Sequence, residues 1–345
     1  MKKNLLYISL AALGLTFAAC ENGDNEFPNF DYSTVKFANQ YPVRTIELGE
    51  DENVDLTGDN QHTITIKAVW GGGYSNPGDV LIDYMVDPSL CTNLYFAQSG
   101  TAGEKVEVMP QSYYELKDSK IRIPAGQVIG GVDVKLTDAF FADPKSVSTT
   151  YVIPIRMTQV AGADSILTGK AIVDNPSWTT ATDWSTQPMN YVLYAVKFVN
   201  PWHGQYLRRG IDQYANGGSN TVRHQQYVEN DEAVNLTTTG MQTCTLPLTL
   251  KDASGNNITY TLQLTFAADG SCTLSSNNPD VVVSGKGTFV SKGEKQSLGG
   301  KDRDALYLDY NVNLKNQNLQ FATKDTLVLR TRNVMGAEYY SVIKR

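Results

Sequence analysis

One short segment of the chain places aromatic rings close to hydrogen-bonding side chains. It begins with Trp202 and His203 and continues with Gln205, Tyr206, Arg208, Arg209, Asp212, Tyr214 and Asn216. Sugars expose C–H groups on one face and hydroxyls around the edge, so flat rings cover the first while polar side chains bind the second. The segment therefore predicts carbohydrate binding, with candidate ligand-binding residues Trp202, His203, Tyr206, Arg208, Tyr214 and Asn216.

The same segment also fits a structural role. Pro201 precedes it and Gly217-Gly218 follow it, which places part of it at the mouth of a loop. Trp202 and Tyr206 nevertheless share the alternation of a strand, and a tryptophan near the first strand of a barrel often fills the core. For Trp202 we favour this plug over ligand contact.

The other tryptophans give two weaker candidates. Three glycines separate Trp70 from Tyr74, so Tyr74 is predicted to stand at a mobile tip as a further ligand-binding residue, and Trp70 to lie in the core. Trp178 and Trp184 lie in a polar segment. We interpret them as residues that dock two domains together, with a ligand cleft between the domains as the alternative.

Signatures of catalysis are absent from the sequence. The three histidines have no metal-type spacing, and no nucleophile elbow, P-loop or dinucleotide-binding glycine motif occurs. Two carboxylate pairs could be imagined across a glycosidic bond; they are Asp302 with Asp304 and Glu229 with Glu232. With 36 acidic residues such pairs arise by chance, so solvated loop charges are favoured. We expect no enzyme activity, no cofactor and no metal.

The N-terminus has the layout of a bacterial lipoprotein signal. Lys2 and Lys3 precede an apolar run over residues 5–17, which is too short to span a bilayer comfortably. Small residues then stand directly before Cys20. This arrangement resembles a signal in which the thiol is lipidated and the peptide is cut before it. We expect residues 1–19 to be the signal peptide and Cys20 the lipidation site; a plain secretory peptide is the alternative.

The residues after Cys20 refine the predicted location. Residues 20–29 are polar and acidic and form a flexible tether. They resemble the acidic stretch that follows the lipidated cysteine in outer-surface lipoproteins of Bacteroidetes. This resemblance implies an outer-membrane protein, anchored by lipid and facing the cell exterior. An ordinary disordered leader facing the periplasm is the alternative.

The net charge of the chain argues against one class of partner. Removal of residues 1–19 takes away two lysines and no acids, so the net charge changes from −7 to −9. This balance argues against nucleic acid, whose binding needs clustered Lys and Arg.

The chain has three cysteines in addition to Cys20, and they are Cys91, Cys244 and Cys272. We favour buried free thiols for all three, with a Cys244–Cys272 bridge as the alternative.

Alternating polar and apolar residues dominate the chain, and no helix of three turns is evident. Residues 259–266 and 306–314 alternate most sharply, and Asp269-Gly270 stands between two such runs as a hairpin turn. The fold class is therefore all-β and antiparallel. Residues 174–189 carry two prolines without alternation and are interpreted as a linker. We predict an Ig-like β-sandwich over 30–173 and an antiparallel β-barrel, lipocalin-like, or a second sandwich over 190–345.

Two stretches resemble a family of Bacteroides surface lipoproteins. Residues 113–126, with 132–136 and 151–158, are similar to its N-terminal, adhesin-like β-sandwich, whose function is uncharacterised. Residues 306–312 and 325–332 are similar to the domain that often accompanies it. Such SusE-like proteins belong to polysaccharide-utilisation loci beside SusC/SusD-like transporters. The resemblance implies glycan binding in support of import, with a SusC/SusD-like transporter as partner, and implies no particular site residues.

The sequence thus predicts a non-catalytic surface lipoprotein that binds a polysaccharide or oligosaccharide, with the membrane contacted through the lipid anchor alone. One alternative is a protein-binding adhesin or a structural subunit of a surface complex, which would expose an apolar patch on a sheet face. A third is an unrecognised glycoside hydrolase, which would need paired carboxylates facing one cleft.

Overall fold

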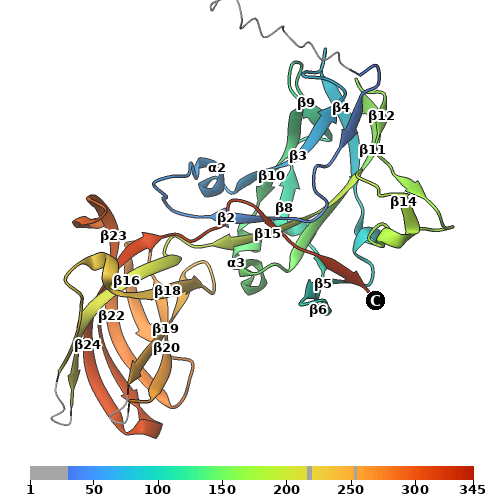
Figure 1. Ribbon diagram of the computed structural model, residues 1–345. Helices are drawn as coiled ribbons and strands as arrows, with labels where there is room; N and C mark the ends of the chain where they lie inside the picture. Colours follow the sequence, from blue (N-terminus) through green and yellow to red (C-terminus); the bar gives the residue numbers. More distant parts are fainter. Residues whose placement is uncertain (1–29, 216–219, 252–254) are drawn as a thin grey trace, which may run out of the picture.

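A computed structural model describes residues 30–215, 220–251 and 255–345, which form two modules (Figure 1). The expected signal peptide, the lipidation site Cys20, the tether and Asn216 lie outside the described residues. The N-terminal module is a sandwich-like arrangement and the second module is a closed barrel. The all-β fold class predicted from alternation is confirmed. The prediction that all strands pair antiparallel is wrong for the N-terminal module, where residues 34–35 pair with 165–166, 151–152 with 107–108 and 195–199 with 43–47 in parallel.

The N-terminal module contains one long, folded sheet with the strand order β12-β1-β3-β10-β9-β4-β11-β15-β2-β25, with β7 beside β11 and β8 beside β10. These strands are β1 (Thr34–Lys36), β2 (Pro42–Glu47), β3 (Thr63–Gly71), β4 (Val80–Val86), β7 (Glu107–Val108), β8 (Tyr114–Leu116), β9 (Lys120–Ile123), β10 (Ile129–Leu136), β11 (Tyr151–Ala161), β12 (Ser165–Ile166), β15 (Tyr191–Val199) and β25 (Glu338–Tyr339).

Smaller elements complete the module. A three-stranded sheet contains β26 (Val342–Lys344), β5 (Leu94–Gln98) and β6 (Thr101–Lys105), and a hairpin pairs β13 (Lys170–Ala171) with β14 (Trp184–Thr186). The helical turns are α2 (Thr57–Asn60), α3 (Asp138–Ala142), η1 (Pro88–Cys91), η2 (Gln111–Tyr113), η3 (Pro144–Val147) and η4 (Ala181–Asp183). Among the described residues, no helix has the length and apolar character needed to cross a membrane.

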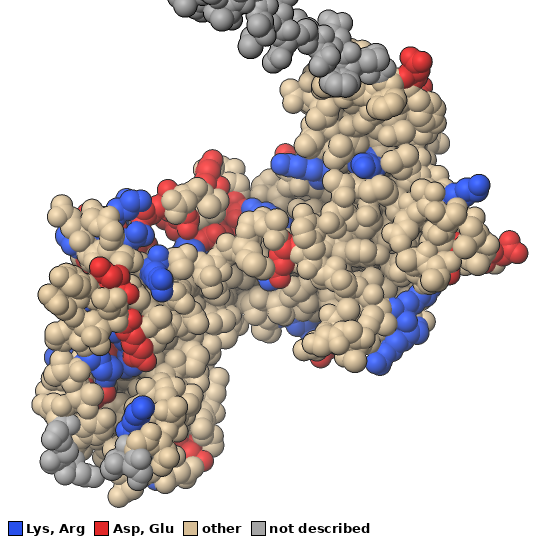
Figure 2. Space-filling view, in the orientation of Figure 1, with Lys and Arg blue, Asp and Glu red and all other residues tan. Residues whose placement is uncertain are grey.

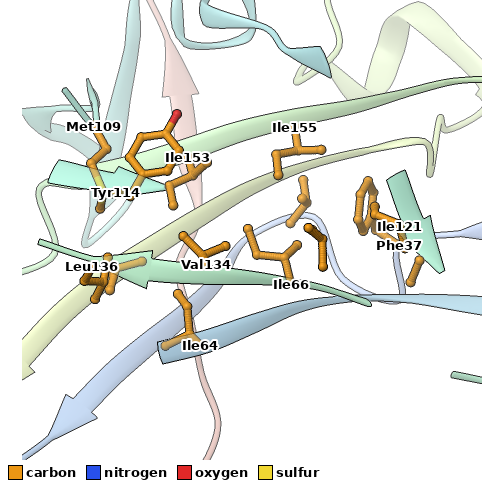
Figure 3. Close-up of a cluster of buried hydrophobic side chains, with 14 of the residues drawn as sticks. Phe37, Ile64, Ile66, Met109, Tyr114, Ile121, Val134, Leu136, Ile153 and Ile155 are labelled. Carbon is orange, nitrogen blue, oxygen red and sulfur yellow. The ribbon is translucent and has the colours of Figure 1, made fainter. Parts of the chain in front are cut away.

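The alternating residues of these strands meet in one apolar core. Ile153 and Ile155 of β11 face Ile64 and Ile66 of β3, with Val134 of β10 between them (Figure 3). Each of these side chains is at most 4% exposed. The core thus encloses the faces that period-2 alternation assigns to the interior, and Trp70 lies in it as expected.

The barrel closes because its last strand pairs with its first. Its strands are β16 (Gly204–Tyr214), β18 (Glu232–Thr238), β19 (Thr243–Lys251), β20 (Asn257–Phe266), β21 (Ser271–Ser275), β22 (Val281–Leu298), β23 (Lys301–Leu314) and β24 (Leu319–Thr331), with β17 (Thr221–Arg223) beside β16 and with η5 (Val228–Asn230) and η6 (Lys315–Gln317) in connections. The predicted turn at Asp269-Gly270 joins β20 to β21, with Gly270 at φ +82°. Of the two predicted architectures, the structure has the barrel.

The barrel is an insertion within the N-terminal module. We expected the second module to span 190–345, but β15 pairs with β11 and β2 in the first sheet. After β24, the chain returns to that sheet, where β25 pairs with β2 and β26 with β5 (Figure 1). The chain therefore crosses between the modules twice, at residues 200–203 and again after Thr331.

Arg332 joins both crossings at the junction. Its side chain is buried and donates to the carbonyl oxygens of Leu48, Glu50, Asn200 and His203 at 2.8–3.1 Å. Acidic side chains of the loop after β2 gather beside it, on the face where the modules meet (Figure 2). Among them, Glu52 binds Lys301 and Arg303 of the barrel. These contacts hold the barrel against the sandwich.

Candidate functional site

The structure separates the residues of the predicted carbohydrate-binding segment. The Trp202 ring stacks flat on Phe266, with centroids 4.1 Å apart and 7° between the planes. Tyr206 is fully buried in the barrel core, and its hydroxyl donates to the Trp202 carbonyl at 2.8 Å. Trp202 thus packs against the barrel core, which is the structural role that we favoured for it. Tyr206 has no ring face open to solvent.

Arg208 belongs to an ionic network inside the barrel. It is 2% exposed and donates to Asp325 at 2.8 Å, to Glu232 at 3.1 Å and to the Tyr310 hydroxyl at 3.3 Å. Arg223 also pairs with Asp325. Burial by itself lowers the pKa of Arg208 and is the largest single effect. Asp325 and the other negative or polar neighbours together outweigh burial, so the pKa of Arg208 is raised. The Arg208 side chain is therefore committed to the barrel interior.

The remaining candidates lie in different places. His203 accepts a hydrogen bond from the Thr238 backbone at 3.2 Å, and burial lowers the His203 pKa to about 4, so the ring is neutral. Tyr214 lies at the other end of β16 and packs on Phe321 at 5.6 Å. Tyr74 is 73% exposed in the N-terminal module, beside a glycine turn as expected. The described candidates therefore do not form one site.

A second group of aromatic residues does surround a cavity. Trp178 packs on Tyr191 of β15 and on Trp184, each at 5.7 Å between ring centroids. The polar segment over 174–189 therefore folds onto the N-terminal module, and the two tryptophans pack there rather than between the modules. Tyr41, just before β2, completes the group by packing against Tyr191 at 6.3 Å.

We call the resulting cavity the aromatic pocket. Its volume is about 230 Å³, and it is lined by Gln40, Tyr41, Trp178, Thr179, Ala181, Gln187, Pro188, Tyr191, Ser341 and Val342. These residues come from the segment just before β2, the 174–189 segment, the start of β15 and the C-terminal tail. No charged residue lines the aromatic pocket.

Hydrogen bonds fix the aromatic walls of this pocket. The Tyr191 hydroxyl donates to the Trp178 carbonyl at 3.0 Å and so accepts from the Tyr41 hydroxyl at 2.7 Å. Burial raises the pKa of both tyrosines, which keeps the hydroxyls neutral. The Arg156 guanidinium lies 5.8 Å from the Trp178 ring centroid while Asp87 binds it at 2.7 Å. These contacts within the protein hold the aromatic side chains in their places around the pocket.

The rim of the aromatic pocket supplies polar groups. Within the described part of the chain, neither the indole N–H of Trp178 nor the side-chain amide of Gln187 makes a hydrogen bond. Gln187 and Ser341 are exposed. Flat aromatic walls with uncharged donors and acceptors at the rim match the apolar face and hydroxyl edge of a sugar.

Three of the four carboxylates in the imagined pairs make polar contacts in the barrel, and two of them, Asp302 and Asp304, line a cavity of about 150 Å³ beside the junction of the modules. Asp302 accepts hydrogen bonds from Lys295 and from the backbone of Gln296, each at 3.0 Å. Asp304 accepts from the backbone of Lys292 at 2.8 Å, and Glu232 binds Arg208. Neither these three carboxylates nor Glu229 lines the aromatic pocket, and no cluster suited to a metal ion occurs in the described ranges.

Sequence reasoning singled out Trp178 and Trp184 but missed Tyr41, Tyr191, Gln187 and Ser341. A signal for Tyr191 was available, because it opens a nearly continuous apolar run over residues 191–199. Such a run is typical of a strand buried on both faces. Tyr41 and Ser341 are distant from Trp178 in the sequence, and no local pattern relates them.

Comparisons with known proteins match two family models to separate parts of the chain. Residues 201–333 match a domain of unknown function, DUF5627, and residues 28–164 match a family of N-terminal domains. No curated protein matches the chain. A multidomain protein including DUF1735 from Bacteroides ovatus is 12% identical over 87% of this chain and 94% of that chain, with a TM-score of 0.40. An auxiliary nutrient binding protein from Bacteroides thetaiotaomicron is 15% identical over 83% and 90%, with a TM-score of 0.37.

A much stronger match is a crystal structure of a Bacteroides ovatus protein of unknown function. It is 59% identical to this chain, with a TM-score of 0.87, and the match covers 92% of this chain and 100% of that chain. Identity at this level over both modules shows common descent of the whole two-module arrangement. The chain therefore belongs to the same family as this Bacteroides ovatus protein of unknown function.

Proposed function

We propose that this protein is a non-catalytic, lipid-anchored surface protein that binds polysaccharide and holds it for a SusC/SusD-like importer. The aromatic pocket is the observation that carries the proposal. Hydrogen bonds hold its two tyrosine rings, Trp178 packs on one of them, and its lining is uncharged. Each contact with a sugar is weak, so capture gains from many copies tethered to one membrane, and fast release suits transfer to an importer.

Substitution of Trp178 tests the binding function. Trp178→Ala is expected to weaken polysaccharide binding about 30-fold, because truncating an aromatic residue at the centre of a binding site typically costs about 2 kcal/mol. Retardation in native gels that contain xylan, mannan, galactomannan or dextran measures this effect. Gln187→Ala should also weaken binding, since it removes an exposed rim amide.

Two controls accompany this measurement. Gln213→Ala removes an exposed amide of the barrel and should bind as the wild type does. Trp178→Phe keeps a ring in place if the alanine variant fails to fold. Wild-type protein that is retarded in none of the gels would disprove glycan binding. Release of reducing sugars during incubation would instead support the glycoside hydrolase alternative.

The anchor is tested at Cys20. We expect Cys20→Ser to move the protein from the membrane fraction to the soluble fraction, because each buried methylene of an acyl chain contributes about 0.8 kcal/mol. Intact mass spectrometry of the wild type should show acyl chains on a chain that begins at Cys20. Cys91→Ser is the matched control, since Cys91 is a buried free thiol like Cys244 and Cys272. A wild-type protein without lipid would contradict the anchoring, and protease protection on intact cells would contradict the outward orientation.

A further inference from the structure

The aromatic pocket has a counterpart on the opposite face of the same sheet. At this end of the module the sheet consists of β15, β2 and β25, and β25 is its last strand. Neighbouring residues of a strand point to opposite faces. Tyr191 lines the aromatic pocket, while Val192 and Tyr194 line a second cavity. In the same way, Tyr41 lines the aromatic pocket and its neighbour Pro42 lines the second cavity. One sheet therefore separates the two cavities.

We call this second cavity the edge groove. Its volume is about 530 Å³, and it is lined by Ala38, Asn39, Pro42, Arg44, Asp55, Gly58, Asp59, Thr63, Ile64, Thr65, Ile66, Lys67, Val192, Tyr194 and Tyr339. The C-terminal tail completes both cavities. Tyr339 pairs with Pro42 and belongs to the edge groove, whereas Ser341 belongs to the aromatic pocket.

The edge groove also has tyrosine rings in its lining, but unlike the aromatic pocket it has charged residues as well. Tyr339 is 61% exposed and presents a ring to solvent at the sheet edge. Burial raises the pKa of Tyr194, so its hydroxyl is a neutral hydrogen-bonding group. Arg44 is already paired with Asp59. Lys67 is exposed and has no ion-pair partner within the ranges that the structure describes.

Charges in the two cavities are balanced. The edge groove has two basic residues, Arg44 and Lys67, and two acidic residues, Asp55 and Asp59. The aromatic pocket has none. Neither cavity therefore offers the excess of positive charge that would select an acidic sugar chain. This composition favours a neutral polysaccharide.

We propose that one neutral polysaccharide chain occupies both cavities by crossing the sheet edge at β25. This inference rests on the proposed function and specifies its ligand. Only residues 338–339 form the outermost strand, and among the described residues nothing pairs with its outer side. Two weak sites on one rigid wall convert the second contact into an intramolecular event, which strengthens binding without any new contact type.

The dependence of affinity on oligosaccharide length distinguishes binding in one cavity from binding in both. Partial acid hydrolysis of the polysaccharide that retards the wild type in gels provides a length series for isothermal titration calorimetry. We expect affinity to increase by about 10-fold or more once the chain is long enough to reach the second cavity. Tyr339→Ala should abolish that increase and leave the affinity for the shortest binding oligosaccharide unchanged.

The matched control is Tyr227→Ala, which removes a tyrosine of similar exposure from the barrel and should retain the full length dependence. If Tyr339→Ala binds every length as the wild type does, the edge groove is not a site, while the proposed function stands. If polygalacturonate is bound more tightly than the neutral polysaccharides, the inferred ligand class is wrong. If the wild type binds no glycan, the proposed function itself fails.

Discussion

Arg332→Ala is expected to lower the free energy of unfolding by about 3–5 kcal/mol, because it removes a buried guanidinium together with its hydrogen bonds to backbone carbonyls and its ion-pair contact with the buried Glu47. Arg332 is 3% exposed and donates to four carbonyl oxygens, two after β2 and two at the first crossing between the modules. The Glu47 carboxylate lies 3.4 Å from it, and burial raises the Glu47 pKa. Alanine would leave all five groups without this partner.

Urea unfolding followed by tryptophan fluorescence measures this effect. We expect a lower midpoint and also a smaller dependence on urea, since modules that unfold separately expose less surface in each step. Arg330→Ala is the control, because Arg330 lies two residues earlier on β24 and is exposed. Arg332→Lys should recover little stability, since an ammonium group lacks the planar fork that reaches several carbonyls. An Arg332→Ala protein as stable as Arg330→Ala would show that the junction depends on other contacts.

The junction also shows what local sequence patterns can reveal. Alternation over residues 259–266 and 306–314 predicted barrel strands correctly, because one face of each strand lies in the core and the other in solvent. The strand β15 has a different pattern. Its residues contact the sandwich core on one side and a second cluster, with Leu90 and Leu94, on the other. Burial on both faces removed the alternation, and the strand was predicted to belong to the second module although it pairs in the first.

The return of the tail could not be predicted in this way. The strands β25 and β26 have two and three residues, which is too short for any periodic pattern. Their partners β2 and β5 lie some 250–300 residues earlier in the chain. Both cavities depend on this non-local pairing, because Tyr339 and Ser341 reach them only when the tail is in place.

The candidate binding residues show the same difference between what local sequence patterns predict and what non-local pairing determines. Residue types correctly indicated that aromatic side chains were the chemistry to follow, but the densest aromatic segment became the first strand of the barrel. Tyr206 and Arg208 alternate inward there, and the closed barrel has filled its interior with them. The aromatic pocket instead assembles from three segments that are remote in the chain. Composition therefore identified a class of interaction, and topology decided where it could occur.

Asp325→Ala is expected to destabilise the barrel by about 3–5 kcal/mol, since it leaves the buried Arg208 and the partly buried Arg223 without their shared carboxylate. The Asp325 side chain has no solvent exposure and binds Arg208 and Arg223. It also accepts a hydrogen bond from the Tyr310 hydroxyl at 2.9 Å. Asp212, which pairs with Arg223, and Glu232, which binds Arg208, would remain, but neither contacts both guanidinium groups.

Asp309→Ala is the matched control for this network. Asp309 lies on the neighbouring strand and pairs with Lys324 at 3.5 Å, but both side chains are more than half exposed. Such a surface pair contributes about 0–1 kcal/mol. The two variants remove the same carboxylate group, one from inside the barrel and one from its outer face. The difference between their urea midpoints therefore measures how much more a buried carboxylate contributes to stability than an exposed one. Equal midpoints would mean that Arg208 and Arg223 find water or other acceptors once Asp325 is gone, and that the interior of this barrel is open enough to solvate them.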